Sequence, residues 1–175
     1  MQRTKLLIVD DHPLFRHGLM EVLEAEEAFD IVGEASDGNE AVDKALALRP
    51  DVVIMDLYMP NCDGIEATRR LQNEMPETKV LILTVSGREE DLFRAMHSGA
   101  RGYMVKNEKP ELLVQAIQKI ANGGTASSVL GGLKAGQPRV AEPPLSPREQ
   151  EVLPLLAQNA TDRAIAFRLS TTEIA

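Results

Sequence analysis

The chain has 175 residues, 43% of them hydrophobic, enough for one well-buried domain and a small appendage at about 100 to 150 residues per domain. It contains no run of about 18 apolar residues, and Asp10 and Asp11 interrupt the apolar start of the chain before a signal peptide could be completed. These features and the single cysteine predict a cytoplasmic protein that enters no membrane.

The net charge of −8 belongs entirely to the first part of the chain. Residues 1–121 contain 22 Asp and Glu against 14 Lys and Arg, whereas residues 122–175 contain 5 of each kind. A nucleic-acid surface is therefore not expected on residues 1–121, because neutralising phosphates requires a local excess of Lys and Arg.

Five apolar segments of strand length alternate with amphipathic segments of helix length up to about residue 121. The predicted strands are Lys5–Val9, Ile31–Ala35, Val52–Met55, Val80–Leu83 and Gly102–Val105. Three of them contain continuous apolar runs (LLIV, VVIM and VLIL), which is typical of parallel strands covered by helices on both faces. The pattern predicts an α/β fold with a doubly wound parallel (βα)5 sheet, flavodoxin-like with strand order 2-1-3-4-5.

The character of the sequence changes at residue 122. Residues 122–144 are rich in Gly, Pro, Ala and Ser and lack periodicity, so they are predicted to be an interdomain linker. A new helix is predicted after Leu145, with Ser146 as N-cap, Pro147 in the first turn and Glu149 at the capping-box position. A second short helix is expected within the remaining residues, and residues 145–175 are treated as a separate segment.

Polar side chains follow four of the five predicted strands. Asp10 and Asp11 follow the first strand, Asp56 the third, Thr84 ends the fourth, and Lys106 follows the fifth. Ligands of open parallel sheets bind at the carboxyl edge where the strand order reverses, so the five residues are expected to share one pocket. The histidines His12, His17 and His97 show no ligand spacing and are expected to be solvated.

Each of these residues also has an ordinary interpretation. Asp10 and Asp11 could cap the helix that begins near Pro13, Asp56 could belong to a turn, and Lys106 could be a surface charge. Their joint position at one end of successive parallel strands favours a common site.

Three carboxylates in one cleft require compensation, since a pair 4 Å apart repels by about 4 kcal/mol at an effective dielectric of about 20. A divalent cation with oxygen ligands, Mg²⁺ or Mn²⁺, would supply it. Lys106 and the Thr84 hydroxyl suit the oxygens of a transferring phosphoryl group, and Asp56 as nucleophile would form an acyl phosphate.

Four strings of residues 1–121, LLIVDDHPLFRHGL, VVIMDLYMPNCDGIEATRRL, VLILTVS and GARGYMVKNEKPELLVQAI, together resemble the receiver domain of bacterial two-component response regulators. The later string LSPREQEVLPLLAQNATDRAIAFRLS resembles the first part of a LuxR-type helix-turn-helix. The whole chain is therefore similar to the NarL/FixJ subfamily of response regulators, with a receiver at 1–121 and an incomplete DNA-binding domain at 145–175.

The resemblance implies that a sensor histidine kinase supplies the phosphoryl group that Asp56 accepts. Asp11 and Asp56, with Asp10 acting through a water molecule and with the backbone carbonyl of Tyr58, would hold the metal. Thr84 and Tyr103 would form the conformational switch, and phosphorylation could promote a homodimer. No activity as an enzyme on a separate substrate is implied.

The resemblance is not complete. Asn107 follows the pocket lysine where many receivers have proline, and the tail differs from the family pattern at Asn159, Asp162 and Thr171. The recognition helix of the family would follow Ala175. We therefore expect these 175 residues to bind promoter DNA weakly or not at all, and a longer form to bind it.

Three alternatives remain at this stage. A stand-alone receiver would act through protein contacts. A phosphatase of the haloacid-dehalogenase type also uses an aspartate nucleophile, but its nucleophile follows the first strand and has a second aspartate two residues later. A flavodoxin-like cofactor carrier is disfavoured because the first turn, DDHP, is acidic where a flavin phosphate needs hydroxyls and free N–H groups.

Overall fold

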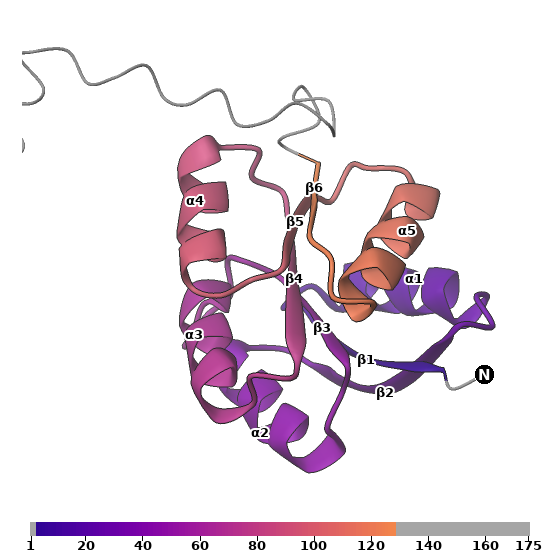
Figure 1. Ribbon diagram of the computed structural model, residues 1–175, viewed down its shortest axis with the longest axis horizontal. Helices are drawn as coiled ribbons and strands as arrows, with labels where there is room; N and C mark the ends of the chain where they lie inside the picture. Colours follow the sequence, from indigo (N-terminus) through magenta and orange to yellow (C-terminus); the bar gives the residue numbers. More distant parts are fainter. Residues whose placement is uncertain (1–2, 129–175) are drawn as a thin grey trace, which may run out of the picture. The chain divides into compact units, whose positions relative to one another are not determined.

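Continuous apolar runs form the central strands of the computed structural model, which describes residues 3–128 (Figure 1). The strands are β1 (Thr4–Val9), β2 (Phe29–Ala35), β3 (Val52–Met55), β4 (Lys79–Thr84), β5 (Gly102–Val105) and β6 (Ala126–Ser127). The helices are α1 (Pro13–Glu24), α2 (Gly38–Leu48), α3 (Gly64–Glu74), α4 (Glu89–His97) and α5 (Pro110–Ala121). The predicted alternation of strand and helix is confirmed.

All neighbouring strands of the sheet are parallel, in the order β2-β1-β3-β4-β5-β6. The predicted order 2-1-3-4-5 is therefore correct, and β6 extends it at the β5 edge. The first residues of the predicted linker form this strand: Gly123 takes a positive φ of 86°, and the Ser128 N–H then donates to the Tyr103 carbonyl at 3.0 Å. The rest of the predicted linker and the predicted helices of 145–175 lie outside the described residues.

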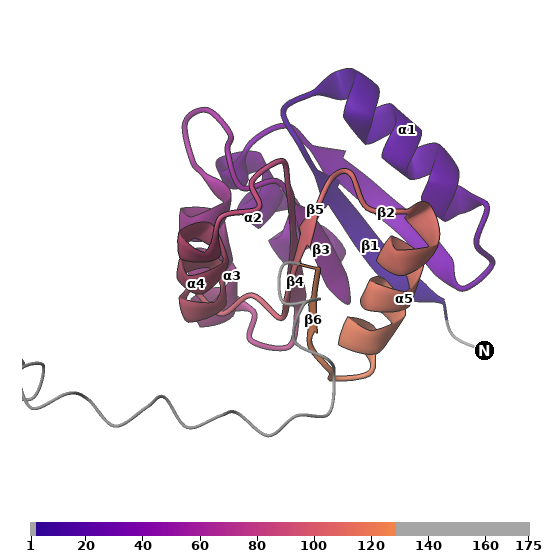
Figure 2. The ribbon, with the colours of Figure 1, turned by 90° about the horizontal axis from the view of Figure 1, so that it is seen from above.

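The pleat of each strand divides the core into two layers. On β1, Leu6 and Ile8 pack in one cluster with side chains of α1 and α5, whereas Leu7 and Val9 pack in the other with side chains of α2, α3 and α4. Figure 2 shows the two groups of helices on opposite faces of the sheet. Because both faces of these strands are covered by helices, successive side chains are all buried, which explains the continuous apolar runs. Burial of each aliphatic side chain stabilises the folded state by about 1.5 to 3 kcal/mol.

Local signals set the helix starts. Proline occupies the first turn of α1 and of α5, as predicted, since its missing N–H has no intrahelical partner there. Asp37 caps α2 by accepting hydrogen bonds from the Asn39 and Glu40 N–H groups, and Asp63 caps α3 by accepting one from the Glu66 N–H. Within the described residues, no helix is long and apolar enough to span a bilayer.

Gly64, the first residue of α3, packs directly on the backbone that follows β3. Its N–H donates to the Leu57 carbonyl at 2.9 Å, and a Cβ atom at this position would collide with the Asp56 carbonyl oxygen. A side chain larger than hydrogen would therefore push α3 away from the loop that carries Asp56.

The Gly64→Ala substitution is expected to lower the free energy of unfolding by about 1 to 3 kcal/mol, because the added methyl overpacks backbone that cannot yield. Gly18→Ala, in the middle of α1 where a Cβ meets nothing within 4 Å, should instead stabilise by about 0.5 to 1 kcal/mol through helix propensity. Urea unfolding followed by circular dichroism measures both. Equal effects of the two substitutions would contradict the packing argument.

Candidate functional site

Two aspartates continue the sheet beyond the ends of adjacent strands, at the point where strand order reverses. Asp10 follows β1, and its N–H donates to the Ala35 carbonyl at 3.1 Å; Asp56 follows β3, and its N–H donates to the Val9 carbonyl at 2.8 Å. The sheet ladder thus fixes both backbones, and their side chains meet at the carboxyl edge, the usual place for a ligand in an open α/β sheet.

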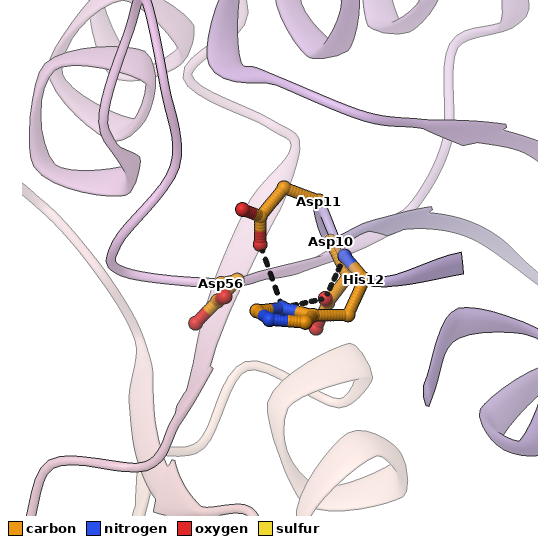
Figure 3. A group of neighbouring side chains, drawn as sticks. All are labelled: Asp10, Asp11, His12 and Asp56. Atoms are coloured by element: carbon orange, nitrogen blue, oxygen red, sulfur yellow. Dashed lines mark hydrogen bonds and ion pairs between the residues drawn. The ribbon is translucent and has the colours of Figure 1, made fainter. Parts of the chain in front are cut away.

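Asp10, Asp11, His12 and Asp56 form a compact cluster (Figure 3). Each offers one potential metal-binding atom, and these atoms lie within 4.8 Å of one another. Asp10 is 2% exposed and Asp56 is 4% exposed, so the two carboxylates lie below the surface. The predicted meeting of the three aspartates is observed.

The Lys106 ammonium joins two of these carboxylates. Its Nζ atom lies 2.6 Å from Asp10 Oδ2 and 3.1 Å from Asp56 Oδ2, and it also lies 4.4 Å from the centre of the Phe15 ring. The Lys106 N–H donates to the Thr84 carbonyl at 2.7 Å, which fixes the start of its loop. The peptide bond to Asn107 is trans, as are all those described.

Three carboxylates gather in the cluster, and the Lys106 ammonium forms ion pairs with two of them. Burial raises the pKa of Asp56 above its ordinary value, and repulsion by Asp10 adds to this shift, although Lys106 and the Leu57 N–H oppose it. The Leu57 N–H donates to Asp56 Oδ1 at 2.8 Å, so both oxygens of Asp56 have a polar neighbour.

The residues present fit a hard divalent cation. Asp11 Oδ1 is buried and accepts no hydrogen bond, which is costly for a carboxylate oxygen. Its neighbour His12 Nδ1, at 2.9 Å, provides an ion pair only when the imidazole is protonated. A cation would satisfy this oxygen together with those of Asp10 and Asp56, and an all-carboxylate oxygen set suits Mg²⁺.

His12 is solvated, as expected, because its side chain is 72% exposed, but its Nδ1 atom lies 2.9 Å from Asp11 Oδ1. The backbone N–H of His12 donates to Asp10 Oδ1 at 2.8 Å. His12, not an aspartate, is the N-cap residue of α1, so helix capping does not account for the acidic pair. The sequence signal for these contacts is that His12 directly follows two aspartates, and the turn brings the three side chains together.

Thr84, Tyr103 and Tyr58 form hydrogen bonds with the segment that follows β4 or with α4. Thr84 is fully buried and its Oγ1 accepts a 3.3 Å hydrogen bond from the Ser86 N–H, so in this structure it bonds its own loop and not Asp56. Tyr103 is fully buried, and its hydroxyl donates to the Ser86 carbonyl at 2.9 Å. The Tyr58 hydroxyl donates to Asp91 Oδ2 at 2.6 Å. Sequence reasoning did not anticipate Asp91.

Removing the bridging charge should destabilise the domain. Lys106→Met leaves Asp10 and Asp56 facing each other without a counter-charge, and we expect a loss of about 2 to 4 kcal/mol in unfolding free energy in metal-free buffer at neutral pH. Lys109→Met, which removes an exposed lysine of the same loop, should change stability by less than about 0.5 kcal/mol. Urea titrations with a chelator present measure both, and similar losses for the two would contradict the bridging role.

The fold and the cluster together define a class: a flavodoxin-like receiver domain, in which a parallel sheet gathers acidic side chains and a lysine at its carboxyl edge. The comparison with family models agrees, because residues 6–118 match the response regulator receiver domain. The chain belongs to this family of response regulator receiver domains.

Curated relatives extend the match beyond the receiver. The nitrate/nitrite response regulator NarL of Escherichia coli K12 is 33% identical, covering 96% of this chain and 82% of that protein. The transcriptional regulatory protein LiaR of Bacillus subtilis is 35% identical over 96% and 83%, and the oxygen regulatory protein NreC of Staphylococcus epidermidis is 37% identical over 94% and 82%. The chain is thus homologous to NarL/LuxR-type response regulators, which are phosphorylated and control transcription.

Solved structures show the same fold. A LuxR-family response regulator from Aurantimonas sp. SI85-9A1 aligns with a TM-score of 0.69 at 36% identity, covering 71% of this chain and 89% of that one. The receiver domain of the putative response regulator NarL from Mycobacterium tuberculosis aligns with a TM-score of 0.68 at 30% identity, covering 70% and 99%. Receivers of this family bind Mg²⁺ at an acidic pocket, and such regulators interact with sensor kinases and, through an output domain, with DNA.

Proposed function

We propose that the chain is a phosphorylatable switch in which Asp56 accepts the phosphoryl group. The observation that carries the proposal is the Lys106 ammonium between Asp10 and Asp56 in a cluster of three carboxylates. A carboxylate oxygen of Asp56 attacks the phosphorus of a phosphohistidine, the P–N bond breaks, and the imidazole leaves with a proton. The product is an aspartyl phosphate.

The proposed metal ligands are Asp11 and Asp56, with Asp10 acting through a water molecule and the Tyr58 backbone carbonyl completing the protein ligands. A Mg²⁺ or Mn²⁺ ion held there would neutralise charge on the phosphoryl oxygens. The unsatisfied Asp11 Oδ1 supports this assignment, because a metal removes the cost of its burial. Asp10 supports it as well, since its Oδ1 is already held by the His12 N–H.

Lys106 and Thr84 are proposed to bind the phosphoryl oxygens. Lys106 Nζ is already 3.1 Å from Asp56 Oδ2, and as the product forms it exchanges this carboxylate for a phosphoryl oxygen. Thr84 would donate its hydroxyl to a phosphoryl oxygen. Its Oγ1 already accepts the Ser86 N–H at 3.3 Å and the Tyr103 hydroxyl donates to the Ser86 carbonyl, so both side chains are bonded to the same loop. The proposed switch therefore consists of Thr84 and Tyr103 acting through the segment that follows β4.

The proposed donor is a cognate sensor histidine kinase, and the proposed output is the regulation of a promoter, with homodimer formation on phosphorylation. The relatives support this role, since they include a nitrate/nitrite response regulator and a transcriptional regulatory protein. The position of Asp56 after β3, not β1, disfavours the phosphatase alternative.

Phosphorylation by a small phosphodonor tests the central assignment. With acetyl phosphate and Mg²⁺, the wild type should gain one phosphoryl group by intact mass, whereas Asp56→Asn should gain none because it lacks the nucleophile. Asp63→Asn is the matched control, since it makes the same change at an exposed aspartate of the same loop where asparagine also caps a helix. Equal mass gain in wild type and Asp56→Asn would refute the assignment.

Metal binding should stabilise the fold. Ligand linkage predicts that Mg²⁺ at about 100 times its Kd raises the unfolding free energy by about 2.7 kcal/mol. Asp11→Asn should lose most of this increment, whereas Asp43→Asn, an exposed position on α2, should retain it. Urea titrations with and without Mg²⁺ provide the comparison. Full retention in Asp11→Asn would remove Asp11 from the ligand set.

A further inference from the structure

A second polar network lies beside the acidic cluster and is centred on Asp91 in the first turn of α4. The Asp91 side chain is only 1% exposed. Its Oδ2 atom accepts hydrogen bonds from the Tyr58 hydroxyl at 2.6 Å, from Arg88 Nε at 3.0 Å and from the Ser86 hydroxyl. One carboxylate oxygen therefore holds three donors from three positions of the chain.

The network connects two loops of the candidate site. Tyr58 stands two residues after Asp56 in the loop that follows β3, and Ser86 stands two residues after Thr84 in the loop that follows β4. Arg88 closes the arrangement, since its Nη2 donates to the Tyr58 hydroxyl at 2.6 Å and lies 2.9 Å from Asp91 Oδ2. Asp91 is thus a fixed point to which both loops are tied.

Asp91 is suited to this task because its side chain is buried and all three donors meet one of its oxygens. Arg88 is one of these donors, and hydrogen bonds between a guanidinium and a carboxylate are charge-assisted and therefore stronger than those between neutral groups.

A simpler explanation is that Asp91 only complements the dipole of α4. Glu89 and Glu90 also lie in the first turn of this helix and are exposed, so the dipole has acidic partners without a buried carboxylate. Dipole complementation also does not require a bond to Tyr58, which lies 33 positions away in the sequence. Complementing the helix dipole therefore does not explain why Asp91 accepts hydrogen bonds from both loops.

We propose that Asp91 is a positioning residue for metal binding: by holding the Tyr58 side chain it fixes the peptide whose carbonyl binds Mg²⁺. This inference rests on the proposed function, which makes that carbonyl a ligand. The Tyr58 residue is 44% exposed, so its hydroxyl bond to Asp91 restrains a loop that packing restrains only in part. Groups that orient a metal ligand preorganise the site and so raise metal affinity.

Mg²⁺ affinity in the full chain, measured by calorimetry without phosphodonor, tests the proposal. Asp91→Asn and Tyr58→Phe should each weaken binding by about 10-fold, at the lower end of what losing a partner of a metal ligand costs. The double variant should bind no more weakly than Tyr58→Phe, because that change already removes the hydrogen bond that Asp91→Asn weakens. Additive losses would contradict a shared action.

Two arginines of the same region provide a matched pair. Arg88→Gln removes the guanidinium that bonds both Tyr58 and Asp91 and should weaken Mg²⁺ binding, whereas Arg94→Gln, whose Nη1 lies 3.9 Å from Asp91 Oδ1, should not. Urea unfolding in metal-free buffer distinguishes an effect on the stability of the fold from an effect on Mg²⁺ binding. If Asp91→Asn and Tyr58→Phe lower stability but keep the wild-type Kd for Mg²⁺, the positioning role is overturned.

Failure of the underlying function gives a different result. In that case the wild type itself shows no Mg²⁺ binding and gains no phosphoryl mass. Failure of the positioning role alone leaves wild-type binding and phosphorylation intact, with the variants indistinguishable from it. Tyr58→Phe keeps the test available if Asp91→Asn does not fold, because it removes only an oxygen from a half-exposed side chain.

Discussion

The ion pairs of Lys106 with Asp10 and Asp56 are the interaction on which the site depends. Like charges at the end of a hydrophobic sheet would push β1 and β3 apart, and the ammonium between them turns this repulsion into a bridge at 2.6 and 3.1 Å. The bridge is possible because β5 delivers the lysine to the edge where the other two strands end. The order of the strands therefore determines which charges meet at this edge of the sheet.

Much of this arrangement could be predicted because it follows from position along parallel strands. The run VVIM of Val52–Met55 has to be buried on both faces, so the strand and the place of Asp56 beyond it follow from the sequence. Two features could not be predicted. The strand β6 has only two residues, too few to show periodicity, and Asp91 has the local appearance of an ordinary acid in the first turn of a helix. The role of Asp91 depends on its hydrogen bond from Tyr58, which is 33 positions away in the sequence and is brought near only by the fold.

The chain joins a family-wide pocket to a set of contacts formed by its own side chains. An acidic pocket is a feature of the response regulator receivers that residues 6–118 match. The pocket is connected to α4 by the contacts among Tyr58, Arg88 and Asp91. Asp56 is only two residues from Tyr58, whose hydroxyl is bonded to this helix, so a change in charge at Asp56 occurs next to that connection. Such a connection allows a local electrostatic event to alter the position of an element on the surface of the domain.

The central place of β1 has a consequence for how the chain reaches this structure. Strand β1 is made first but pairs with both β2 and β3, and the partner of its acidic end, Lys106, is made almost a hundred positions later. A sheet with such distant contacts is slow to form, and β1 has no second partner until β3 has been made. Nascent chains that end before β5 would carry the acidic cluster without its lysine. In this domain, Asp10 and Asp56 therefore have no lysine partner until nearly all of the domain has been synthesised.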